Sequence, residues 1–310
     1  MTVGATPVQQ RVRSDLLAWD EPRPQVDPHL ASQLRSRLTE LTADPVGLVP
    51  GGESLYLSKS KLDALTCDGR YVDLVETPFA WSSPVVRGQL AHHGIEIDVA
   101  GGLQRDPAEV VRVAWERLAT ARGGPSEFLA SLGGAEADAL RGEARAVVAS
   151  FREQFPVVPD WAMHPEDRLR VRLHEGRLVL TGRPDLRLGR PTTDARRMLL
   201  LDLKTGARQP LRHRADMRFY ALLATLKHEV APFRVATYYL DEADWDAEDV
   251  DADVLEAALR DVAAKSARAA LLEHARPPES EWQLVAGPQC GWCGRAPTCP
   301  AAAEAGRAPA

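Results

Sequence analysis

The chain has 310 residues and a mass of 33.9 kDa, and 45% of its residues are hydrophobic and 26% charged. This composition allows a sizeable core and excludes a disordered chain, a collagen and a disulfide-dense miniprotein. A net charge of −6 and a pI near 5.8 argue against a general polyanion binder. No run approaches the roughly eighteen apolar residues of a membrane span, and the N-terminus lacks the apolar stretch of a secretory signal. We therefore expect a soluble, cytoplasmic protein.

Charge is distributed unevenly along the chain. Residues 181–220 carry nine Arg and one Lys against four Asp, whereas Asp241–Asp253 hold eight acidic groups and no base. A basic stretch can direct a phosphate backbone to one face, although on charge alone a solvated Arg-rich surface is the favoured interpretation. Lysine is scarce, at five residues against 33 Arg, so each Lys marks a position where Arg would not serve equally well.

The first half of the chain is predicted to be mostly helical. Its first 25 residues are polar and interrupted by Pro, which indicates a loosely held arm. A helix follows to about Leu41, with Asp27 as its N-cap. We interpret residues 54–74 as a short helical segment that carries Cys67. Apolar residues at helical spacing predict two amphipathic helices, over 107–122 and 135–154.

From Asp167 the pattern changes to that of strands. Residues 168–175 and 177–189 alternate apolar and polar side chains on either side of a tight turn, which predicts a hairpin. Residues 196–206 form a third strand, and their continuous apolar run suits a central position covered on both faces. A helix, a strand and a long Ala-rich helix follow, over 211–229, 233–242 and 252–275. The order predicts an α/β protein with a mixed β-sheet flanked by helices.

Two carboxylates and a lysine are concentrated in the hairpin and the third strand. Asp185 follows Gly-Arg-Pro, and Asp202 and Lys204 point to one face of their strand because side chains repeat every two residues. If the hairpin places Asp185 alongside, two carboxylates and an ammonium meet at one end of the sheet. Two hard oxygen ligands suit Mg²⁺ or Mn²⁺, which can activate water and offset charge on a phosphate. An Asp-x-Lys at a strand end is, by itself, a frequent structural feature.

These residues resemble the PD-(D/E)XK nuclease superfamily, in particular its RecB-like branch. Asp185, Asp202 and Lys204 fill its three catalytic positions, and the resemblance implies a restriction-endonuclease-like fold. It also implies a metal site formed by His92, which follows Gly88 at the family's spacing, by Asp185 and Asp202, and by the backbone carbonyl of Leu203. The adjacent His93 makes the choice of histidine ambiguous.

The family carries a Gln-x-x-x-Tyr motif on the helix after the third strand. Tyr220 matches that motif, but Asp216 stands where the family has Gln. The substrate contact of that Gln would then move to Arg214 or Arg218. With Arg212, these arginines are candidate phosphate contacts beside the site. Alternatively, Tyr220 is an ordinary helix residue packed on the sheet.

All four cysteines fit one pattern. Cys290, Cys293 and Cys299 form Cys-x₂-Cys-x₅-Cys, and Cys67 is the remaining thiol that could complete a four-ligand site. Cytosolic proteins rarely keep disulfides, so metal binding is favoured over buried free thiols. Spacing alone leaves both zinc and an iron–sulfur cluster open, because each takes four thiolates.

The resemblance chooses a 4Fe–4S cluster. AddB-type and CRISPR-associated exonucleases of this branch pair a lone early Cys with a late Cys-x₂-Cys-x₅-Cys, and Ser58-Lys-Ser60-Lys-Leu62…Cys67 is similar to the early segment. The cluster would be a structural staple that joins the two ends of one domain. We expect an N-terminal arm and helix over 1–53, a nuclease domain over 54–300 with a C-terminal cysteine-cluster loop, and a tail over 301–310.

The sequence thus predicts a metal-dependent DNA nuclease, and the resemblance implies an exonuclease that prefers ends or single strands. The chain has no phosphate-loop motif, so any helicase or other DNA-processing activity would come from a partner. The rival hypotheses are a non-catalytic nucleic-acid-binding or scaffold subunit, favoured by the missing Gln, and a zinc-stabilised binding protein with a chance Asp-x-Lys. The acidic stretch could repel DNA or bind a basic partner.

Overall fold

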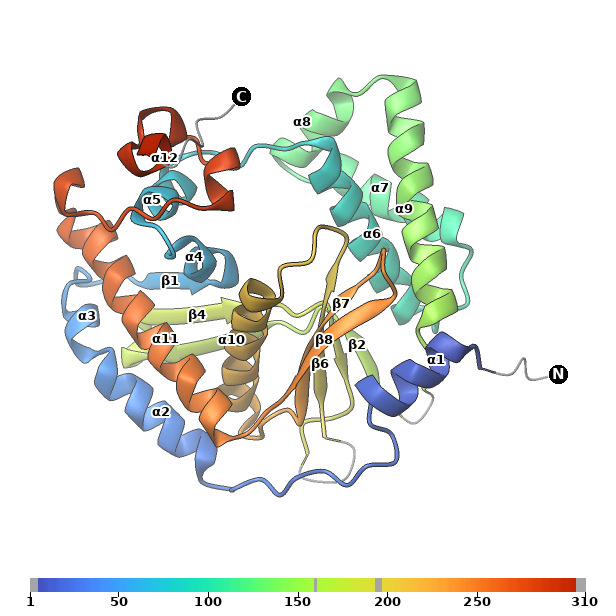
Figure 1. Ribbon diagram of the computed structural model, residues 1–310, viewed down its shortest axis with the longest axis horizontal. Helices are drawn as coiled ribbons and strands as arrows, with labels where there is room; N and C mark the ends of the chain where they lie inside the picture. The colour runs from blue at the N-terminus through green and yellow to red at the C-terminus, as the bar shows by residue number, and fades with distance from the viewer. Residues whose placement is uncertain (1–4, 159–160, 193–196, 305–310) are drawn as a thin grey trace.

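The computed structural model describes residues 5–158, 161–192 and 197–304, and contains two sheets surrounded by helices (Figure 1). The smaller sheet has the order β1-β4-β3, and the larger has the order β2-β5-β6-β7-β8. The strands are β1 Leu55–Ser58, β2 Met163–Pro165, β3 Leu169–Leu173, β4 Leu178–Gly182, β5 Leu186–Leu188, β6 Leu199–Lys204, β7 Arg234–Tyr239 and β8 Asp244–Asp249. This is the mixed α/β architecture expected of a restriction-endonuclease-like fold.

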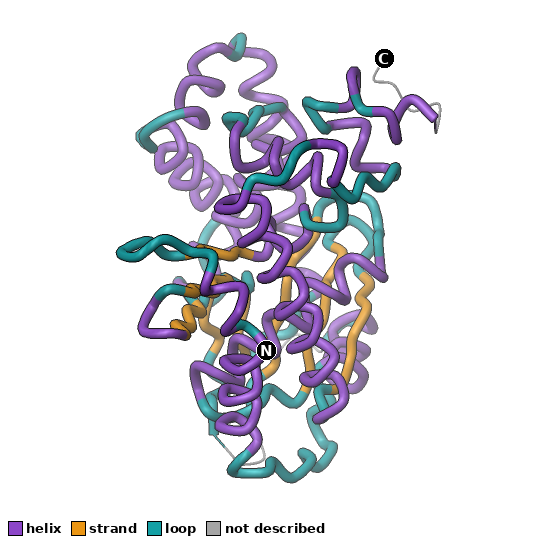
Figure 2. The backbone as a smooth tube through the Cα atoms, turned by 90° about the vertical axis from the view of Figure 1, so that its left-hand side faces the viewer, coloured by secondary structure: helices purple, strands orange, loops and turns teal. Residues whose placement is uncertain are grey.

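The helices fall before, between and after these strands. In chain order they are α1 Pro7–Arg11, α2 Leu30–Leu41, α3 Ala43–Gly47, α4 Lys59–Ala64, α5 Asp68–Glu76, α6 Ser83–Ala100, α7 Pro107–Ala119, α8 Gly124–Ser131, α9 Gly134–Gln154, α10 Pro210–His228, α11 Ala252–Ala270 and α12 Pro300–Glu304. Two π-helical turns, Val12–Leu16 and Leu271–Ala275, extend α1 and α11. Seen from the side, helices flank the strands, and the upper part of the molecule holds helices and loops without strands (Figure 2).

Strand β6 lies between β5 and β7 and separates two hydrophobic cores. Leu200 packs into the core formed with α2, α10 and α11, whereas Leu199, Leu201 and Leu203 pack into the core formed with α6, α7 and α9. The alternation follows from the two-residue repeat of a strand. The uninterrupted apolar run predicted from the sequence therefore reflects burial on both faces, as expected for a central strand.

The expected hairpin is present, but its second half passes from one sheet to the other. β3 and β4 pair antiparallel through the turn at His174–Gly176. The chain then leaves the smaller sheet at Gly182 and joins the larger sheet at Leu186, where β5 pairs antiparallel with β6. Asp185 therefore lies in the short link between two sheets, immediately beside the central strand.

Two segments of the N-terminal half differ from the expectation. The arm was expected to be loosely held, yet Val12, Leu16 and Leu17 are fully buried against the core of the larger sheet. The segment before Cys67 is not wholly helical, because β1 comes first and pairs parallel with β4. Strands β2 and β8 were also missed, and β8 holds four of the eight acidic residues of the acidic stretch. The end of the expected tail, residues 305–310, lies outside the described residues.

Among the described residues, no helix is both long and apolar enough to cross a bilayer.

Candidate metal and nucleic-acid site

Asp185 and Asp202 meet because β5 and β6 are neighbours. In their antiparallel register Leu186 lies opposite Leu201, so Asp185, directly before β5, comes opposite Asp202 in β6. Asp185 Oδ2 accepts a hydrogen bond from the backbone N–H of Leu203 at 2.6 Å. The structure therefore brings Asp185 and Asp202 together at one end of the sheet.

Asp202 is a buried carboxylate with two ammonium neighbours. It is 4% exposed. Lys204, two residues along the same face of β6, lies against its Oδ2, and Lys59 Nζ lies 3.7 Å from its Oδ1. Burial opposes ionisation of Asp202, but the charges of Lys204 and Lys59 outweigh it and hold the pKa of the carboxyl below its usual range. Asp202 therefore stays anionic.

Helix α6 brings His92 to these carboxylates. A Cβ on Gly88 would lie 3.2 Å from Oγ1 of Thr205, so glycine lets the helix approach the end of β6 closely. His92 Nδ1 lies 3.0 Å from Asp185 Oδ1. Burial lowers the pKa of His92, but the Asp185 carboxylate more than compensates and raises it overall. His93 instead pairs with Glu96 at 3.1 Å, so the structure brings His92 to the site.

Helix α10 carries Tyr220 and Asp216 to the same region. The Tyr220 hydroxyl donates a hydrogen bond to the backbone carbonyl of Arg183 at 3.3 Å. Its ring packs so closely on Gly182 that a Cβ there would lie 2.7 Å away. Burial, reinforced by the charge of Asp202, raises the pKa of Asp216. Tyr220 thus both packs on the sheet and lies beside the site.

The three candidate phosphate-binding arginines are all paired with carboxylates. Arg212 contacts both oxygens of Asp63 at 2.6 Å. Arg214 and Arg218 pair with acidic residues of β8, namely Asp246 at 2.7 Å and Glu248 through two hydrogen bonds. A phosphate contact by any of the three would require it to exchange its present partner. The acidic stretch therefore neutralises part of the basic stretch.

Lys59 is a site residue that sequence reasoning missed. It begins α4 directly after β1, and its Nζ lies 3.4 Å from Asp216 Oδ2 as well as near Asp202. Burial opposes its charge, but Asp202, Tyr220 and Asp216 raise its pKa well above the usual value. The scarcity of lysine marked it as one of five positions to question, but nothing in its local pattern linked it to β6.

The chemistry of the donors fits a hard divalent cation. Asp202 Oδ2 is buried and, although the Lys204 ammonium lies beside it, accepts no regular hydrogen bond from any described residue. Asp185 and Asp202 offer carboxylate oxygens and His92 an imidazole nitrogen, a set that suits Mg²⁺ or Mn²⁺. Among the described residues, the group whose ligand atoms all lie within 4.8 Å of one another is instead His93, Glu96 and Glu166. Glu96 and Glu166 already pair there with Arg117 and Arg183.

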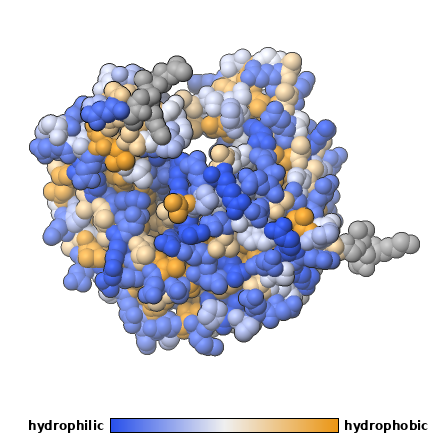
Figure 3. Space-filling model, in the orientation of Figure 1, coloured by the Kyte–Doolittle hydropathy of each residue, from blue (hydrophilic) through white to orange (hydrophobic). Residues whose placement is uncertain are grey.

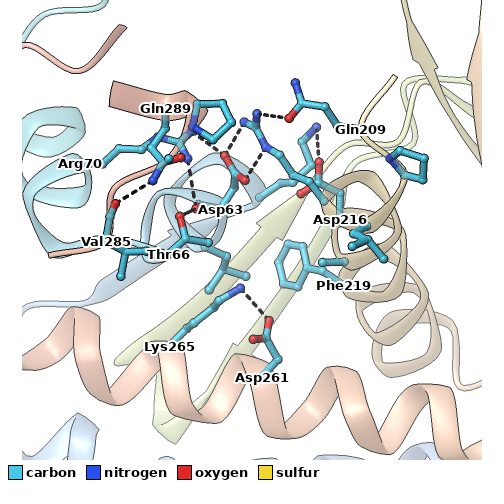
Figure 4. A pocket seen from close by; sticks show the side chains of 18 of the residues that line it. Asp63, Thr66, Arg70, Gln209, Asp216, Phe219, Asp261, Lys265, Val285 and Gln289 are labelled. Atoms are coloured by element: carbon cyan, nitrogen blue, oxygen red, sulfur yellow. Dashed lines mark hydrogen bonds and ion pairs between the residues drawn. The ribbon is translucent and has the colours of Figure 1, made fainter. Parts of the chain in front are cut away.

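A cavity of about 700 Å³ adjoins this site (Figure 4). Lys59 and Asp216 line it at the site, and Gln289 and Trp292 line it toward the C-terminal segment. Asp63 and Arg70 lie on its α4–α5 wall, and Lys265 pairs with Asp261 on α11 at 2.9 Å. In the same region the surface is hollowed between the C-terminal segment and α6 (Figure 3), and the loop from β6 to α10 reaches this hollow.

The four cysteines line one cavity of about 280 Å³. Cys67 precedes α5, while the other three lie in the short turns between residues 288 and 299. The backbone N–H of Val285 points to Cys67 Sγ, and that of Gly287 points to Cys290 Sγ, each at 3.5 Å. Among the described residues, no three of these sulfurs lie within 4.8 Å of one another, since the one group that meets this limit contains no cysteine.

Comparisons with known proteins identify the family of this chain. No curated protein matches the chain. A solved structure described as "Crystal structure of SSO0001" aligns with 87% of this chain and 95% of its own, at 13% identity and a TM-score of 0.32. The sequence profile of the PD-(D/E)XK nuclease superfamily matches residues 64–300, which is more than half of the chain. This range includes His92, Asp185, Asp202 and Lys204, and the chain belongs to the PD-(D/E)XK nuclease superfamily.

Proposed function

We propose that the protein is a divalent-metal-dependent deoxyribonuclease that hydrolyses phosphodiester bonds from free DNA ends. One observation carries the proposal: Asp185, Asp202 and Lys204 converge where β5 and β6 meet, with the Lys204 ammonium on the buried Asp202 carboxylate. A non-catalytic binding subunit would have no need to keep this set of charged groups partly buried, because desolvating charges is costly.

His92, Asp185, Asp202 and the backbone carbonyl of Leu203 would hold Mg²⁺ or Mn²⁺. The bound cation supplies a water of lowered pKa and a positive charge beside the phosphate. Lys204 would hold the attacking water by a hydrogen bond and offset charge on the phosphate oxygens. Hydrolysis forms a bond from the water oxygen to phosphorus and breaks the bond to the sugar oxygen. One proton of the water goes to that sugar oxygen, and the other stays with the phosphate product or solvent.

The preference for free ends or single strands comes from the family resemblance. It is supported by the hollow between the C-terminal segment and α6, toward which the loop after β6 extends. Tyr220 and Asp216 lie beside the site, where they would contact or orient the substrate. Because the chain has no phosphate-loop motif, a helicase or another DNA-processing partner would supply any unwinding.

We further propose that Cys67, Cys290, Cys293 and Cys299 hold a structural 4Fe–4S cluster. Four thiolates at about 2.3 Å from one zinc ion bring their sulfurs to about 3.8 Å apart. The four cysteines here line one cavity of about 280 Å³, which has room for a larger polynuclear cluster. Two backbone N–H groups directed at sulfur are the kind of contact that stabilises ligating thiolates. Such thiols stay available in the reducing cytoplasm, where we place the protein.

The nuclease proposal is tested by incubating anaerobically purified protein with linear and circular DNA, single- and double-stranded, with Mg²⁺ or Mn²⁺. We expect degradation of linear DNA that requires the metal and falls by at least about a hundredfold in Lys204→Ala. Cleavage of circular DNA would indicate an endonuclease instead. Folded, metal-loaded protein that cuts none of these substrates would contradict the proposal and favour the binding-subunit alternative.

The cluster proposal is tested by colour and by metal analysis of the same preparation. We expect a brown protein with about four iron and four sulfide per chain. The colour should be lost in Cys293→Ser. A colourless protein that contains one zinc ion per chain would show the cluster proposal to be wrong without affecting the nuclease proposal.

A further inference from the structure

Lys59 reaches the site by a route that no catalytic motif describes. Its position follows from β1, which pairs parallel with β4, the strand that leads through Gly182 to Asp185. Ser58 ends β1 and caps α4 by accepting a hydrogen bond from the N–H of Lys61 at 3.3 Å. Lys59 is the first residue of that helix, so its side chain extends from the end of the smaller sheet toward the end of β6.

The ammonium of Lys59 lies between two carboxylates and an aromatic ring. Its distance is 3.4 Å to Asp216 Oδ2, 3.7 Å to Asp202 Oδ1 and 5.9 Å to the centre of the Tyr220 ring. Both contacts are ion pairs longer than a regular hydrogen bond, and the contact with Asp216 is the shorter of the two. Asp216 is therefore the closer anchor.

This arrangement leaves Lys59 available to a substrate once Asp202 holds a metal ion. A cation on Asp202 would compete with the longer Lys59 contact, but Asp216 lies outside the proposed ligand set and would retain its pair. Lys59 and Asp216 both line the large cavity beside the site, in which Asp216 is seen on α10 (Figure 4). The ammonium thus lies between the metal-binding carboxylates and the space where nucleic acid would lie.

Because position 216 is an Asp and not a Gln, binding a phosphate beside it requires a nearby cation. The amide of a Gln can donate a hydrogen bond to a phosphate, whereas the carboxylate of Asp216 repels one. A cation between them turns this repulsion into two attractions. The nearby arginines are less suited, because Arg212, Arg214 and Arg218 each pair with a carboxylate outside the metal site.

We propose that Lys59 is a substrate-binding residue whose ammonium contacts a backbone phosphate next to the scissile bond, and that Asp216 is the positioning residue that holds it. The pair replaces, in this chain, the contact that an amide at position 216 would make. The inference rests on the proposed nuclease function, which defines the substrate as a polynucleotide, and it adds a second ammonium to the single Lys204 of the catalytic motif.

The first test measures binding rather than cleavage. A fluorescent single-stranded oligonucleotide is titrated with the cleavage-deficient Lys204→Ala protein at a fixed Mg²⁺ concentration, over a range of concentrations of monovalent salt. Adding Lys59→Gln should weaken binding and reduce the slope of log K against log salt by about one phosphate contact, roughly 0.7. The control is Lys265→Gln, a lysine of the same cavity that pairs with Asp261, which should leave the slope unchanged. An unchanged slope in Lys59→Gln would overturn the inference.

The second test measures cleavage kinetics in protein that retains Lys204. Loss of one charge-assisted hydrogen bond should lower kcat/KM of Lys59→Gln about 10- to 100-fold, and Lys59→Arg should recover part of it. Asp216→Ala should have a smaller effect, and Lys59→Ala/Asp216→Ala should be no worse than Lys59→Ala, since the two residues act as one unit. The double variant removes both charges, so it can still test the role of Lys59 if one of the single variants does not fold.

The two proposals fail in different ways. If the unmodified protein does not cut DNA, the nuclease function is wrong, and the binding slopes still decide the role of Lys59. If the unmodified protein cuts and folded Lys59→Gln cuts equally well, the nuclease function stands and the Lys59 inference is wrong.

Discussion

Individual charged side chains in this protein are held by partners from distant segments. Asp202 on β6 lies near Lys59 from α4 and Lys204 from its own strand, and Asp185 is held by His92 from α6. A buried carboxylate without such partners would protonate or destabilise the fold. The site is therefore charged before any metal or substrate arrives, and its charges are nearly balanced.

His213 on α10 makes the stability of the metal-free protein depend on pH. It is 7% exposed, its Nδ1 lies 3.0 Å from the Tyr239 hydroxyl, and burial together with the Lys204 charge lowers its pKa to about 4. The unfolded chain, with a pKa near 6.5, binds the proton more readily, so stability falls as the pH drops from about 6.5 to 4. We expect a loss on the order of 3 kcal/mol from this group.

The measurement is the free energy of unfolding in urea, without metal, at several pH values. His213→Gln should have a shallower dependence on pH between 6.5 and 4 than the unmodified protein. Equal slopes in the two proteins would contradict the assignment.

Gly182 is the residue where the chain passes beneath Tyr220. A Cβ at this position would lie 2.7 Å from the Tyr220 ring and 2.9 Å from Leu223, which is fully buried. Gly182→Ala should therefore destabilise the protein by about 1–3 kcal/mol through overpacking. Gly142→Ala is the matched control, because Gly142 lies exposed in α9 with nothing within 4 Å of the added carbon. It should raise the thermal midpoint slightly, through helix propensity; equal midpoints for both variants would refute the prediction.

At the scale of elements, β8 is an acidic strand that pairs with the basic helix α10. Its Asp246 and Glu248 face Arg214 and Arg218 on α10. The sequence left two roles open for this acidic stretch, namely repelling DNA or binding a basic partner. The structure gives it an internal partner, which limits the positive charge that α10 presents near the site.

Releasing these arginines should strengthen nonspecific DNA binding. In Asp246→Asn/Glu248→Gln the two guanidinium groups become available to phosphates, so affinity should rise several-fold and the salt slope should steepen by about one to two. Asp249→Asn is the control, because its partner Arg234 is also held by the carbonyls of Asp15 and Leu16. Fluorescence anisotropy at several salt concentrations measures both effects, and unchanged affinity in the double variant would count against this role of β8.

Features that depend on neighbouring segments of the chain could be predicted from the sequence, and features that depend on contacts between distant segments could not. The convergence of Asp185, Asp202 and Lys204 was predictable because it depends on strand periodicity and on neighbouring segments. Lys59 was not, because its place depends on the parallel pairing of β1 with β4, and no local pattern specifies that partner. β8 was missed because Asp241–Asp253 was interpreted only as an acidic stretch that repels DNA or binds a basic partner. In the structure its Asp246 and Glu248 pair with Arg214 and Arg218 of α10.

At the scale of the whole molecule, the proposed cluster would join the segment after α4 to the turns near the C-terminal end. Cys67 follows the short helix α4, whose first residue is Lys59, and its three partners lie in the turns near the C-terminal end. The hydrophobic cores around β6 do not depend on these turns. Loss of the cluster should therefore loosen α4 and the large cavity before it unfolds the sheets.

We expect Cys67→Ser to lose nuclease activity and to unfold at a lower temperature, while its far-ultraviolet circular dichroism remains close to that of the unmodified protein. Structural metal centres contribute directly to folding free energy, so a fall of several degrees is expected. Thr298→Ser, beside Cys299, controls for a small polar change in the same turn. A Cys67→Ser protein with full activity would show that the site does not need the cluster.

The pairing of β1 with β4 also affects the rate and order of folding. Leu55 and Leu178 are adjacent in space but about 120 residues apart in the chain, and α6, α7, α8 and α9 lie between them. Contacts between such distant residues slow folding, because a long loop must close before any pairing energy is gained. On the ribosome, β1 emerges long before its partner strand and stays unpaired until the intervening helices have been made. The order of synthesis thus makes Lys59 the first of the named site residues to be made, and one that must wait for β4 before it can reach its place.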